Sequence, residues 1–258
     1  MFMKDNIVFL HGITGDRNAF KIEYEYLKSS YDCWWYDFPG YGLDTLGKDV
    51  PFSLEVLVEQ LNSEYERAGI EVAHLCALSF GCLPALAFAN KYPEKVASLT
   101  FSGGYCNVPS EFQANLAQLL TRKSEYTNQS WLKQYALLQN PNRKEIPEDS
   151  QSIFYKYGQL LHPNVFEKAV RIQMEFDSEE MLMSIKQPVL WVMGEHDHLY
   201  KETLYNINYW IPHVTYIELK NAGHVAHIHE PKQFMDVFES FLKEIECRSL
   251  KVMEELVI

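Results

Sequence analysis

The stretch Val72–Lys91, VAHLCALSFGCLPALAFANK, decides how the rest of the chain is interpreted. Its first part is a short apolar run, typical of a buried strand, and the part after Ser79 carries apolar residues at helical spacing. A side chain can project from so sharp a strand-to-helix turn only if the residues two before and two after it are small. Ala77 and Gly81 satisfy this requirement, although Ala77 departs from the commoner G-x-S-x-G pattern. We therefore interpret Ser79 as a projecting side chain and a candidate nucleophile.

Short apolar runs alternate with helix-like stretches along the chain. The predicted strands are Asn6–Leu10, Cys33–Tyr36, Val72–Cys76, Ala97–Phe101, Pro188–Met193 and Val214–Leu219. The predicted helices are Ala19–Ser29, Ser53–Ala68 with Ser53 as N-cap, Phe80–Lys91, Lys201–Tyr209 and Pro231–Ile245. Cys247–Ile258 is either an extension of the last helix or a docked tail. Strands that alternate with helices are joined by right-handed crossovers, so this pattern predicts an α/β fold with a mostly parallel sheet of about six strands flanked by helices.

The alternation is interrupted between residues 107 and 183. No convincing strand occurs there, and Leu, Phe, Tyr and Trp recur at helical spacing. We expect residues 107–183 to form an inserted helical lid, and residues 1–106 and 184–258 to form one core. Several prolines would divide the lid into short helices: Pro141, Pro147 and Pro163.

Two later strands end in turns that carry the groups a serine nucleophile needs. A neutral hydroxyl requires a base within hydrogen-bonding distance and a third group that fixes the tautomer of that base. Asp197 follows the strand Pro188–Met193, and His224 follows the strand Val214–Leu219. In a parallel sheet both turns emerge at the edge where Ser79 lies. We therefore expect His224 to be the base and Asp197 to be the carboxylate that orients it.

Other ionisable side chains lie near these turns in the sequence. Glu195 and Asp177 compete for the orienting role. His227 and His229 crowd the loop of His224, but no Cys or carboxylate set completes a metal ligand sphere at a recognised spacing. We expect no metal, and we interpret His227 and His229 as polar or packing residues at the start of a helix.

The first predicted strand ends in the glycine-containing loop HGITG, residues 11–15. In acyl transfer, negative charge develops on the carbonyl oxygen of the substrate, and two preorganised backbone N–H groups stabilise it by roughly 3–4 kcal/mol each. The candidate donors are the N–H of Ile13 in this loop and the N–H of Phe80. Phe80 begins the helix after Ser79, where the helix dipole also favours an anion.

Composition and charge restrict the class of protein. The chain has 258 residues, a formal charge of −12 and a pI near 5.2, and its Lys and Arg residues are scattered, so nucleic acids and anionic membranes are poor partners. The five cysteines show no CxxC spacing, which argues against a disulfide framework. Neither a secretory signal nor an apolar stretch of about 18 residues is visible. We expect a cytoplasmic enzyme without a cofactor.

Together these segments resemble the α/β-hydrolase family, in its lid-bearing, esterase-like branch, over nearly the whole chain. The matching segments are the HGITG loop, Asp37–Gly42 (DFPGYG), the turn at Ser79 and the turns at Asp197 and His224, in this order. The resemblance implies that Asp37–Gly42 is a structural loop without a catalytic role. The two strands that usually precede the HG loop in this family have no counterpart before Ile7, which shortens the sheet at an edge far from the site.

The resemblance implies a serine hydrolase that cleaves a small or medium-sized carboxylic ester through an acyl-enzyme on Ser79. Serine at the turn argues against dehalogenases and epoxide hydrolases, which carry aspartate there. Thioesterases, lactonases and C–C bond hydrolases share the same residues and are alternatives, and a ligand-binding receptor on this fold is a third class. Trp131 and Tyr155 are our candidates from the aromatic-rich lid for the walls of an apolar substrate pocket. The sequence does not indicate an oligomeric state.

Overall fold

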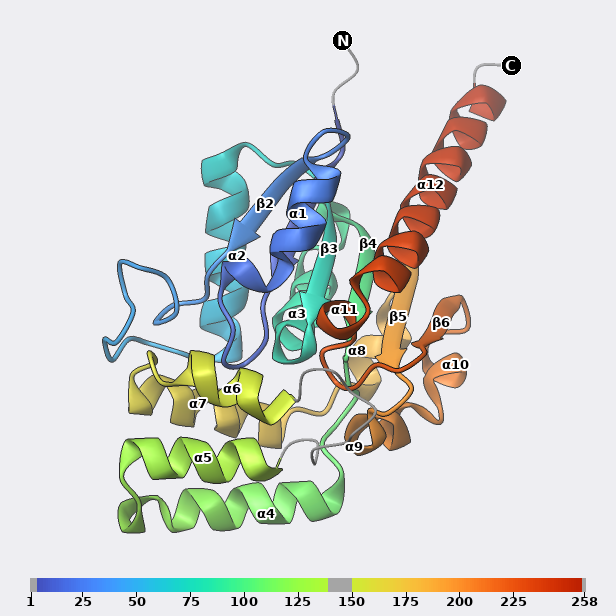
Figure 1. The fold of residues 1–258 in the computed structure, drawn as a ribbon. Coiled ribbons are helices and arrows are strands. Elements are labelled where there is room, and N and C mark those ends of the chain that lie inside the picture. The colour runs from blue at the N-terminus through green and yellow to red at the C-terminus, as the bar shows by residue number, and fades with distance from the viewer. Residues whose placement is uncertain (1–3, 139–149, 257–258) are drawn as a thin grey trace.

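The computed structural model describes residues 4–138 and 150–256 (Figure 1). Six strands form one parallel sheet in the order β2-β1-β3-β4-β5-β6. Their bounds are β1 Asn6–Leu10, β2 Asp32–Tyr36, β3 Ala73–Leu78, β4 Val96–Ser102, β5 Val189–Gly194 and β6 Val214–Leu219. The predicted parallel sheet of six strands is therefore confirmed.

Helices of the two faces follow the predicted alternation. They are α1 Lys21–Leu27 after the short 3₁₀ turn η1 Arg17–Phe20, α2 Leu54–Ala68, α3 Cys82–Lys91 after η2 Ser79–Gly81, α11 Ala226–His229 and α12 Pro231–Leu256. The side chain of Ser53 caps α2 by accepting a hydrogen bond from the N–H of Val56 at 3.2 Å. Helix α12 continues without a break from Pro231 to Leu256. The segment from Cys247 to Leu256 is therefore an extension of this helix and not a docked tail.

The predicted helix Lys201–Tyr209 is wrong. The chain forms three short pieces there, α9 His198–Lys201, η5 Glu202–Leu204 and α10 Ile207–Trp210. The carboxylate of Asp197 accepts a hydrogen bond from the N–H of Tyr200 and so starts α9 before the expected position. Asn206 then takes a non-helical N-cap conformation and starts α10 separately.

Alternate residues of β1 enter two different cores. Val8 and Leu10 belong to the core on the side of α2 and α3, whereas Ile7 and Phe9 belong to the core on the side of α1 and α12. Every residue of the inner strands β3 and β5 is buried, because helices cover both faces of the sheet. None of the described helices is long and apolar enough to cross a membrane.

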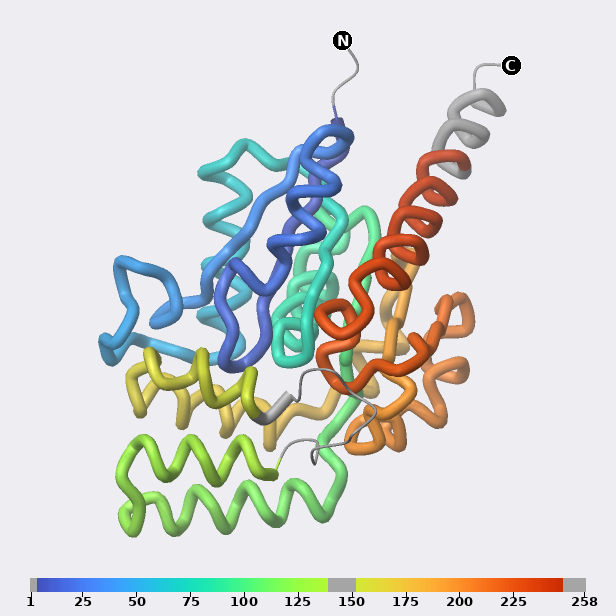
Figure 2. Tube along the Cα trace, in the orientation of Figure 1, coloured from blue at the N-terminus to red at the C-terminus, as the bar shows by residue number. Residues whose placement is uncertain are grey.

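A group of helices between β4 and β5 lies across the carboxyl ends of the strands (Figure 2). They are α4 Ser110–Thr121, η4 Lys123–Glu125, α5 Asn128–Leu138, α6 Ser150–Gly158 and α7 Pro163–Glu175. Helix α8 Glu179–Ser184 follows them and lies beside the end of α3, where Asn90 Nδ2 donates to the carbonyl of Met181 at 3.2 Å. Pro163 occupies the first turn of α7, whereas Pro141 and Pro147 lie outside the described residues. The division of the chain into a core and a lid at residues 107 and 183 stays a prediction.

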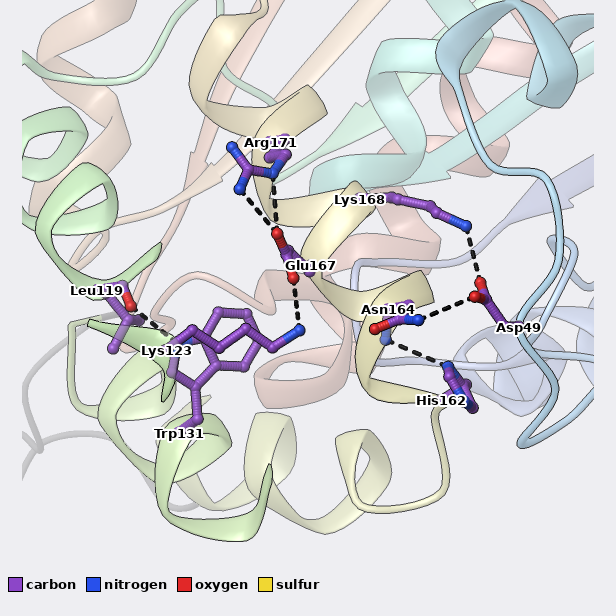
Figure 3. A network of polar contacts seen from close by, with 9 residues as sticks. All are labelled: Asp49, Leu119, Lys123, Trp131, His162, Asn164, Glu167, Lys168 and Arg171. Carbon is purple, nitrogen blue, oxygen red and sulfur yellow. Dashed lines mark hydrogen bonds and ion pairs between the residues drawn. The ribbon is translucent and has the colours of Figure 1, made fainter. Parts of the chain in front are cut away.

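Polar contacts hold α7 on two sides (Figure 3). Asp49, in the connection between β2 and α2, accepts hydrogen bonds from Asn164 Nδ2 at 2.9 Å and from Lys168 Nζ at 2.8 Å. On the other side, Glu167 forms an ion pair with Lys123, which follows α4. Such partly exposed pairs stabilise a protein by less than about 1 kcal/mol each, but together they fix where α7 lies relative to the sheet.

Candidate active site

The turn between β3 and α3 presents Ser79 in a strained conformation. Its φ angle is 50°, in the left-handed region that a side chain other than glycine rarely adopts. Gly81 is required two residues later, because a Cβ atom there would lie only 2.5 Å from the carbonyl oxygen of His11. The turn therefore brings the chain close to the end of β1 and directs Ser79 out of the sheet edge.

Three side chains from separate turns form a continuous chain of hydrogen bonds. His224 Nε2 lies 2.7 Å from Ser79 Oγ, and His224 Nδ1 lies 2.8 Å from Asp197 Oδ2. All three side chains are buried. With Nδ1–H donating to the carboxylate, Nε2 is left as an acceptor for the serine hydroxyl, which is the tautomer a general base needs.

Asp197 contacts His224, whereas the two competing carboxylates lie elsewhere. Asp197 is fully buried, and its second oxygen, Oδ1, accepts from the N–H of Tyr200 at 3.4 Å as the N-cap of α9. Glu195 is about half exposed and accepts from the backbone N–H of a neighbouring loop, and Asp177 is exposed and accepts from a backbone N–H in its own turn. One short side chain therefore both starts a helix and contacts the imidazole.

The loop that carries His224 passes very close to the end of β4. Gly103 has a φ angle of 59°, and a Cβ atom there would lie 2.3 Å from the carbonyl oxygen of His224. The imidazole lies near two aromatic rings, with ring centroids 4.7 Å away for Tyr200 and 6.0 Å away for Phe154. Neither Tyr200 nor Gly103 was predicted from the sequence. The only local signals are that Tyr200 follows a capping aspartate and that Gly103 directly follows a strand.

The two other histidines of this loop hydrogen-bond to the backbone. His227 Nε2 donates to the carbonyl of Ala19 at 3.1 Å, and burial lowers the pKa of His227 to about 3, which keeps it neutral. His229 Nδ1 accepts from the N–H of Gly223 at 2.9 Å. Within residues 4–138 and 150–256, no group of three His, Cys, Asp or Glu side chains could hold a metal ion.

The HGITG loop is held in one orientation by His11. The carbonyl of Gly12 accepts from His11 Nδ1 at 2.8 Å and from the N–H of Gly15 at 3.0 Å. His11 Nε2 accepts from the N–H of Phe38 at 3.1 Å, and burial lowers the pKa of His11, which favours this neutral tautomer. Because the Gly12–Ile13 peptide is trans, the N–H of Ile13 points in the direction opposite to the Gly12 carbonyl, which His11 and Gly15 hold.

The segment Asp37–Gly42 supports this loop from the side of β2. Asp37 Oδ1 accepts from the backbone N–H of Arg17 at 2.8 Å and forms an ion pair with the Arg17 side chain. The hydroxyl of Tyr41 donates to the carbonyl of Ile13 at 2.6 Å. These contacts hold the HGITG loop and the turn after it against the segment that follows β2.

A cavity of about 170 Å³ opens beside Ser79. Its apolar walls come mainly from α1, the end of β3, α6 and α11: Ile22, Leu78, Ile153, Phe154, Tyr157, Val225 and Ile228. Trp131 and Tyr155, which were predicted to line the substrate pocket, do not line this cavity. Trp131 Nε1 donates to the carbonyl of Leu119 at 3.0 Å (Figure 3), and its ring lines a separate cavity between α5, α6 and α7. The hydroxyl of Tyr155 accepts from Gln129 Nε2 at 2.9 Å.

Comparison with known proteins identifies the family. A family model described as the alpha/beta hydrolase fold matches residues 5–171, so this chain belongs to the α/β-hydrolase family. The 3-oxoadipate enol-lactonase 1 of Acinetobacter baylyi is 25% identical over 252 residues, which cover 93% of this chain and 89% of that protein. The pimeloyl-[acyl-carrier protein] methyl ester esterase of Aeromonas hydrophila is 24% identical, over 92% of this chain and 95% of that protein.

Solved structures show the same fold at lower sequence identity. The enol-lactonase from Burkholderia xenovorans has a TM-score of 0.79 at 17% identity, over 94% of this chain and 92% of that chain. A thermophilic esterase from Thermogutta terrifontis has a TM-score of 0.76 at 21% identity, over 94% and 91% of the two chains.

Proposed function

We propose that this protein is a serine hydrolase that cleaves a small or medium-sized carboxylic ester through an acyl-enzyme on Ser79. The observation that carries the proposal is the continuous hydrogen-bond chain from Asp197 through His224 to Ser79, with distances of 2.8 and 2.7 Å. The names of the two full-length relatives, a lactonase and a methyl ester esterase, support carboxylic ester chemistry.

In the first half of the reaction, Ser79 Oγ attacks the ester carbonyl carbon. His224 Nε2 takes the hydroxyl proton as the Oγ–C bond forms, and Asp197 stabilises the resulting imidazolium. The C–O bond to the alcohol then breaks, and His224 gives the proton to the departing oxygen. The products of this half are the free alcohol and an acyl group on Ser79.

In the second half, water attacks the acyl-enzyme. His224 takes a proton from the water, the bond between the carbonyl carbon and Ser79 Oγ breaks, and the proton returns to Oγ. The carboxylic acid leaves and the serine is regenerated. No group beyond the chain and water is needed to balance this reaction.

The N–H groups of Ile13 and Phe80 stabilise the oxyanion in both halves. Phe80 is the residue directly after the nucleophile, and Ile13 lies in the loop held by His11 and Tyr41. Donors that are held in place before the substrate binds need no reorganisation when the charge develops, which is what makes such a site effective.

The cavity beside Ser79 sets the size of the group that binds there. Its volume of about 170 Å³ is close to the roughly 150 Å³ of an apolar cavity that holds one benzene molecule. We therefore expect an acyl or alkyl group of about six to eight non-hydrogen atoms. Lid residues Ile153, Phe154 and Tyr157 take the role that was assigned to Trp131 and Tyr155.

A lactonase is the second candidate, because the relative named as an enol-lactonase matches over nearly the full length of both chains. A lactone is a cyclic ester, so the same residues would open it without a separate alcohol product. Thioesterase and C–C bond hydrolase activities use the same triad, and a receptor would keep the pocket without turnover. Residence in the cytoplasm stays a prediction.

A panel of substrates separates these candidates. We expect p-nitrophenyl esters of two to eight carbons to be hydrolysed, with a thioester, a lactone and a vinylogous diketone assayed beside them. A fluorophosphonate probe should label the parent protein on Ser79 and leave Ser79→Ala unlabelled. Absence of both turnover and labelling would contradict the proposed function and favour a receptor.

A further inference from the structure

Tyr200 contacts two members of the proposed triad at once. Its ring centroid lies 4.7 Å from that of His224, and its backbone N–H donates to Asp197 Oδ1 at 3.4 Å. Tyr105 stacks on Tyr200 with centroids 4.6 Å apart, and both tyrosines are almost fully buried. Tyr200 is therefore held between the triad and the core, where it can hardly move.

The phenol of Tyr200 is connected to two helices of the lid. Gln173 on α7 donates from Nε2 to the Tyr200 hydroxyl at 2.8 Å, and its Oε1 accepts from the hydroxyl of Tyr135 on α5 at 2.8 Å. Gln173 is 1% exposed, and a buried amide is tolerated only when its polar atoms are hydrogen-bonded. The contacts that Asp49 makes with α7 fix the helix that carries Gln173.

We propose that Tyr200 is a positioning residue for His224 and Asp197, and that the Gln173 bridge makes this alignment depend on helices α5 and α7. The inference rests on the proposed function of the triad. Neither Tyr200 nor Gln173 lines the cavity beside Ser79 or touches the reacting atoms.

The physical reason lies in the geometry that the imidazole must keep. His224 has to hold Nδ1 at Asp197 and Nε2 at Ser79 simultaneously, and a misplacement of about 1 Å can cost 100-fold in rate. The Tyr200 ring restricts the tilt of the imidazole, and its π face also favours the imidazolium that forms during the reaction. The Tyr200 N–H holds the carboxylate oxygen that His224 does not use.

Three variants test the proposal on the ester that the parent turns over best. Tyr200→Leu removes the ring but keeps the N–H and an apolar filler, and we expect kcat to fall about 10- to 100-fold with KM changed less than about threefold. Tyr200→Phe keeps the ring but removes the hydroxyl that binds Gln173, so we expect an intermediate loss in kcat of about three- to fivefold. Gln173→Met keeps the ring and removes the bridge from its other end, and we expect a similar loss in kcat of about three- to fivefold.

A matched control separates positioning from a loss of stability. Tyr65, in α2, is also a fully buried tyrosine. Its ring packs on that of Phe88 in α3, with centroids 5.1 Å apart, away from the triad. Tyr65→Leu should destabilise the fold to a similar extent and leave kcat within about twofold of the parent. If both Leu variants lower kcat equally, or if Tyr200→Leu leaves it unchanged, the proposal is wrong.

A spectroscopic readout keeps this test independent of turnover. The proton shared by His224 Nδ1 and Asp197 Oδ2 should give a low-field NMR resonance that Asp197→Asn abolishes. We expect Tyr200→Leu to broaden or shift that resonance and Tyr65→Leu to leave it in place. A protein that neither cleaves esters nor reacts with the fluorophosphonate overturns the proposed function, whereas an unchanged resonance in Tyr200→Leu overturns the positioning role. Should Tyr200→Leu not fold, Tyr200→Phe and Gln173→Met decide the test through the bridge, because a parent-like kcat and a parent-like resonance in both would overturn the proposal.

Discussion

Two sets of Ser, His and Asp side chains lie on the sheet, one at the carboxyl ends of its strands (the carboxyl edge) and one near their amino ends (the amino edge). At the carboxyl edge, His224 joins Ser79 and Asp197 at 2.7 and 2.8 Å. At the amino edge, Ser98 Oγ lies 2.8 Å from His74 Nδ1, and His74 Nε2 lies 4.0 Å from Asp5 Oδ2. Both serines are within hydrogen-bonding distance of a histidine.

The surroundings of the two serines differ. Ser98 lies inside strand β4 with no exposed surface, whereas Ser79 lies on a turn with a φ angle of 50° beside a cavity. His74 is buried, which lowers its pKa, and its partner Asp5 is largely exposed. Residue types and a short distance therefore do not make a catalytic site. The turn that projects the serine and the space for a substrate distinguish the two sets.

The largest expected difference is between Ser79→Ala and Ser98→Ala. Ser79→Ala should lower ester hydrolysis by about 10⁵-fold or more, because the hydroxyl is the proposed nucleophile, and should abolish fluorophosphonate labelling. Ser98→Ala should leave kcat within about twofold and cost about 1–3 kcal/mol of stability, because it leaves His74 without its hydroxyl partner. Residual activity above a tenth of the parent in Ser79→Ala would break the comparison.

The carboxylates give the next largest contrast. Asp197→Asn should favour the wrong tautomer of His224 and lower kcat by up to about 10⁴-fold with little change in KM. Glu195→Gln, Asp177→Asn and Asp5→Asn should each stay within a few-fold of the parent, because none of these carboxylates contacts His224. Steady-state kinetics of the four variants decide the assignment, and it fails if another of them loses activity while Asp197→Asn keeps it.

Glu23 is a buried carboxyl group like that of Asp197, but in the described part of the chain it has no histidine partner. It is 1% exposed, its Oε1 has no hydrogen-bond partner among the described residues, and burial raises its pKa to about 8. Above a pH of about 4.5 the unfolded chain ionises while the folded chain keeps the proton, so the free energy of unfolding falls with rising pH until about 8, where the folded carboxyl ionises too.

Glu23→Gln should remove this fall in the free energy of unfolding with rising pH. We expect the variant to gain up to about 4 kcal/mol over the parent between pH 5 and pH 9, since each pKa unit corresponds to about 1.4 kcal/mol. Urea unfolding at the two pH values measures it, with Glu25→Gln on the exposed face of the same helix as the control. Equal pH dependence in the parent and in Glu23→Gln would show that Glu23 titrates normally.

The smallest expected effect concerns the cavity beside Ser79. Tyr157 lines it, whereas Tyr155, two residues earlier on α6, hydrogen-bonds to Gln129 instead. Tyr157→Ala should raise the ratio of octanoate to acetate ester turnover by about tenfold, because it lengthens the cavity. Tyr155→Ala and Trp131→Ala should leave the ratio unchanged. If the ratio responds to Tyr155 and not to Tyr157, the substrate binds on the other side of α6.

Local patterns explain how much of this could be predicted. Short apolar runs predicted the six strands, and the turns that follow three of them predicted that Ser79, Asp197 and His224 lie at the same edge of the sheet. Each run and each turn depends on only a few neighbouring residues. The walls of the cavity were not predictable in this way. Which side chains of α6 face the cavity beside Ser79 depends on how this helix is placed over the strands, and aromatic residues at helical spacing occur on both faces of α6.

The same limit applies to residues that act through long-range contacts. Tyr200 meets Gln173, 27 residues earlier in the chain, and no periodicity links them. The pair of Ser98 and His74 is the opposite case, a suggestive contact between neighbouring strands for which we expect a structural role only. The sequence pattern predicted one continuous helix where the structure has α9 and α10. Asp197 caps the start of α9 and Asn206 occupies the N-cap position of α10, so two separate helices form despite that pattern.

The peptide between Gly12 and Ile13 has a consequence for the time course of the reaction. His11 and Gly15 already hold this peptide by its carbonyl oxygen. In the proposed mechanism the oxyanion donors are therefore ready when the substrate arrives, and no slow peptide flip has to precede the first turnover. Progress curves should start at full velocity without a lag, and a boronic acid that mimics the tetrahedral intermediate should bind in a single kinetic step.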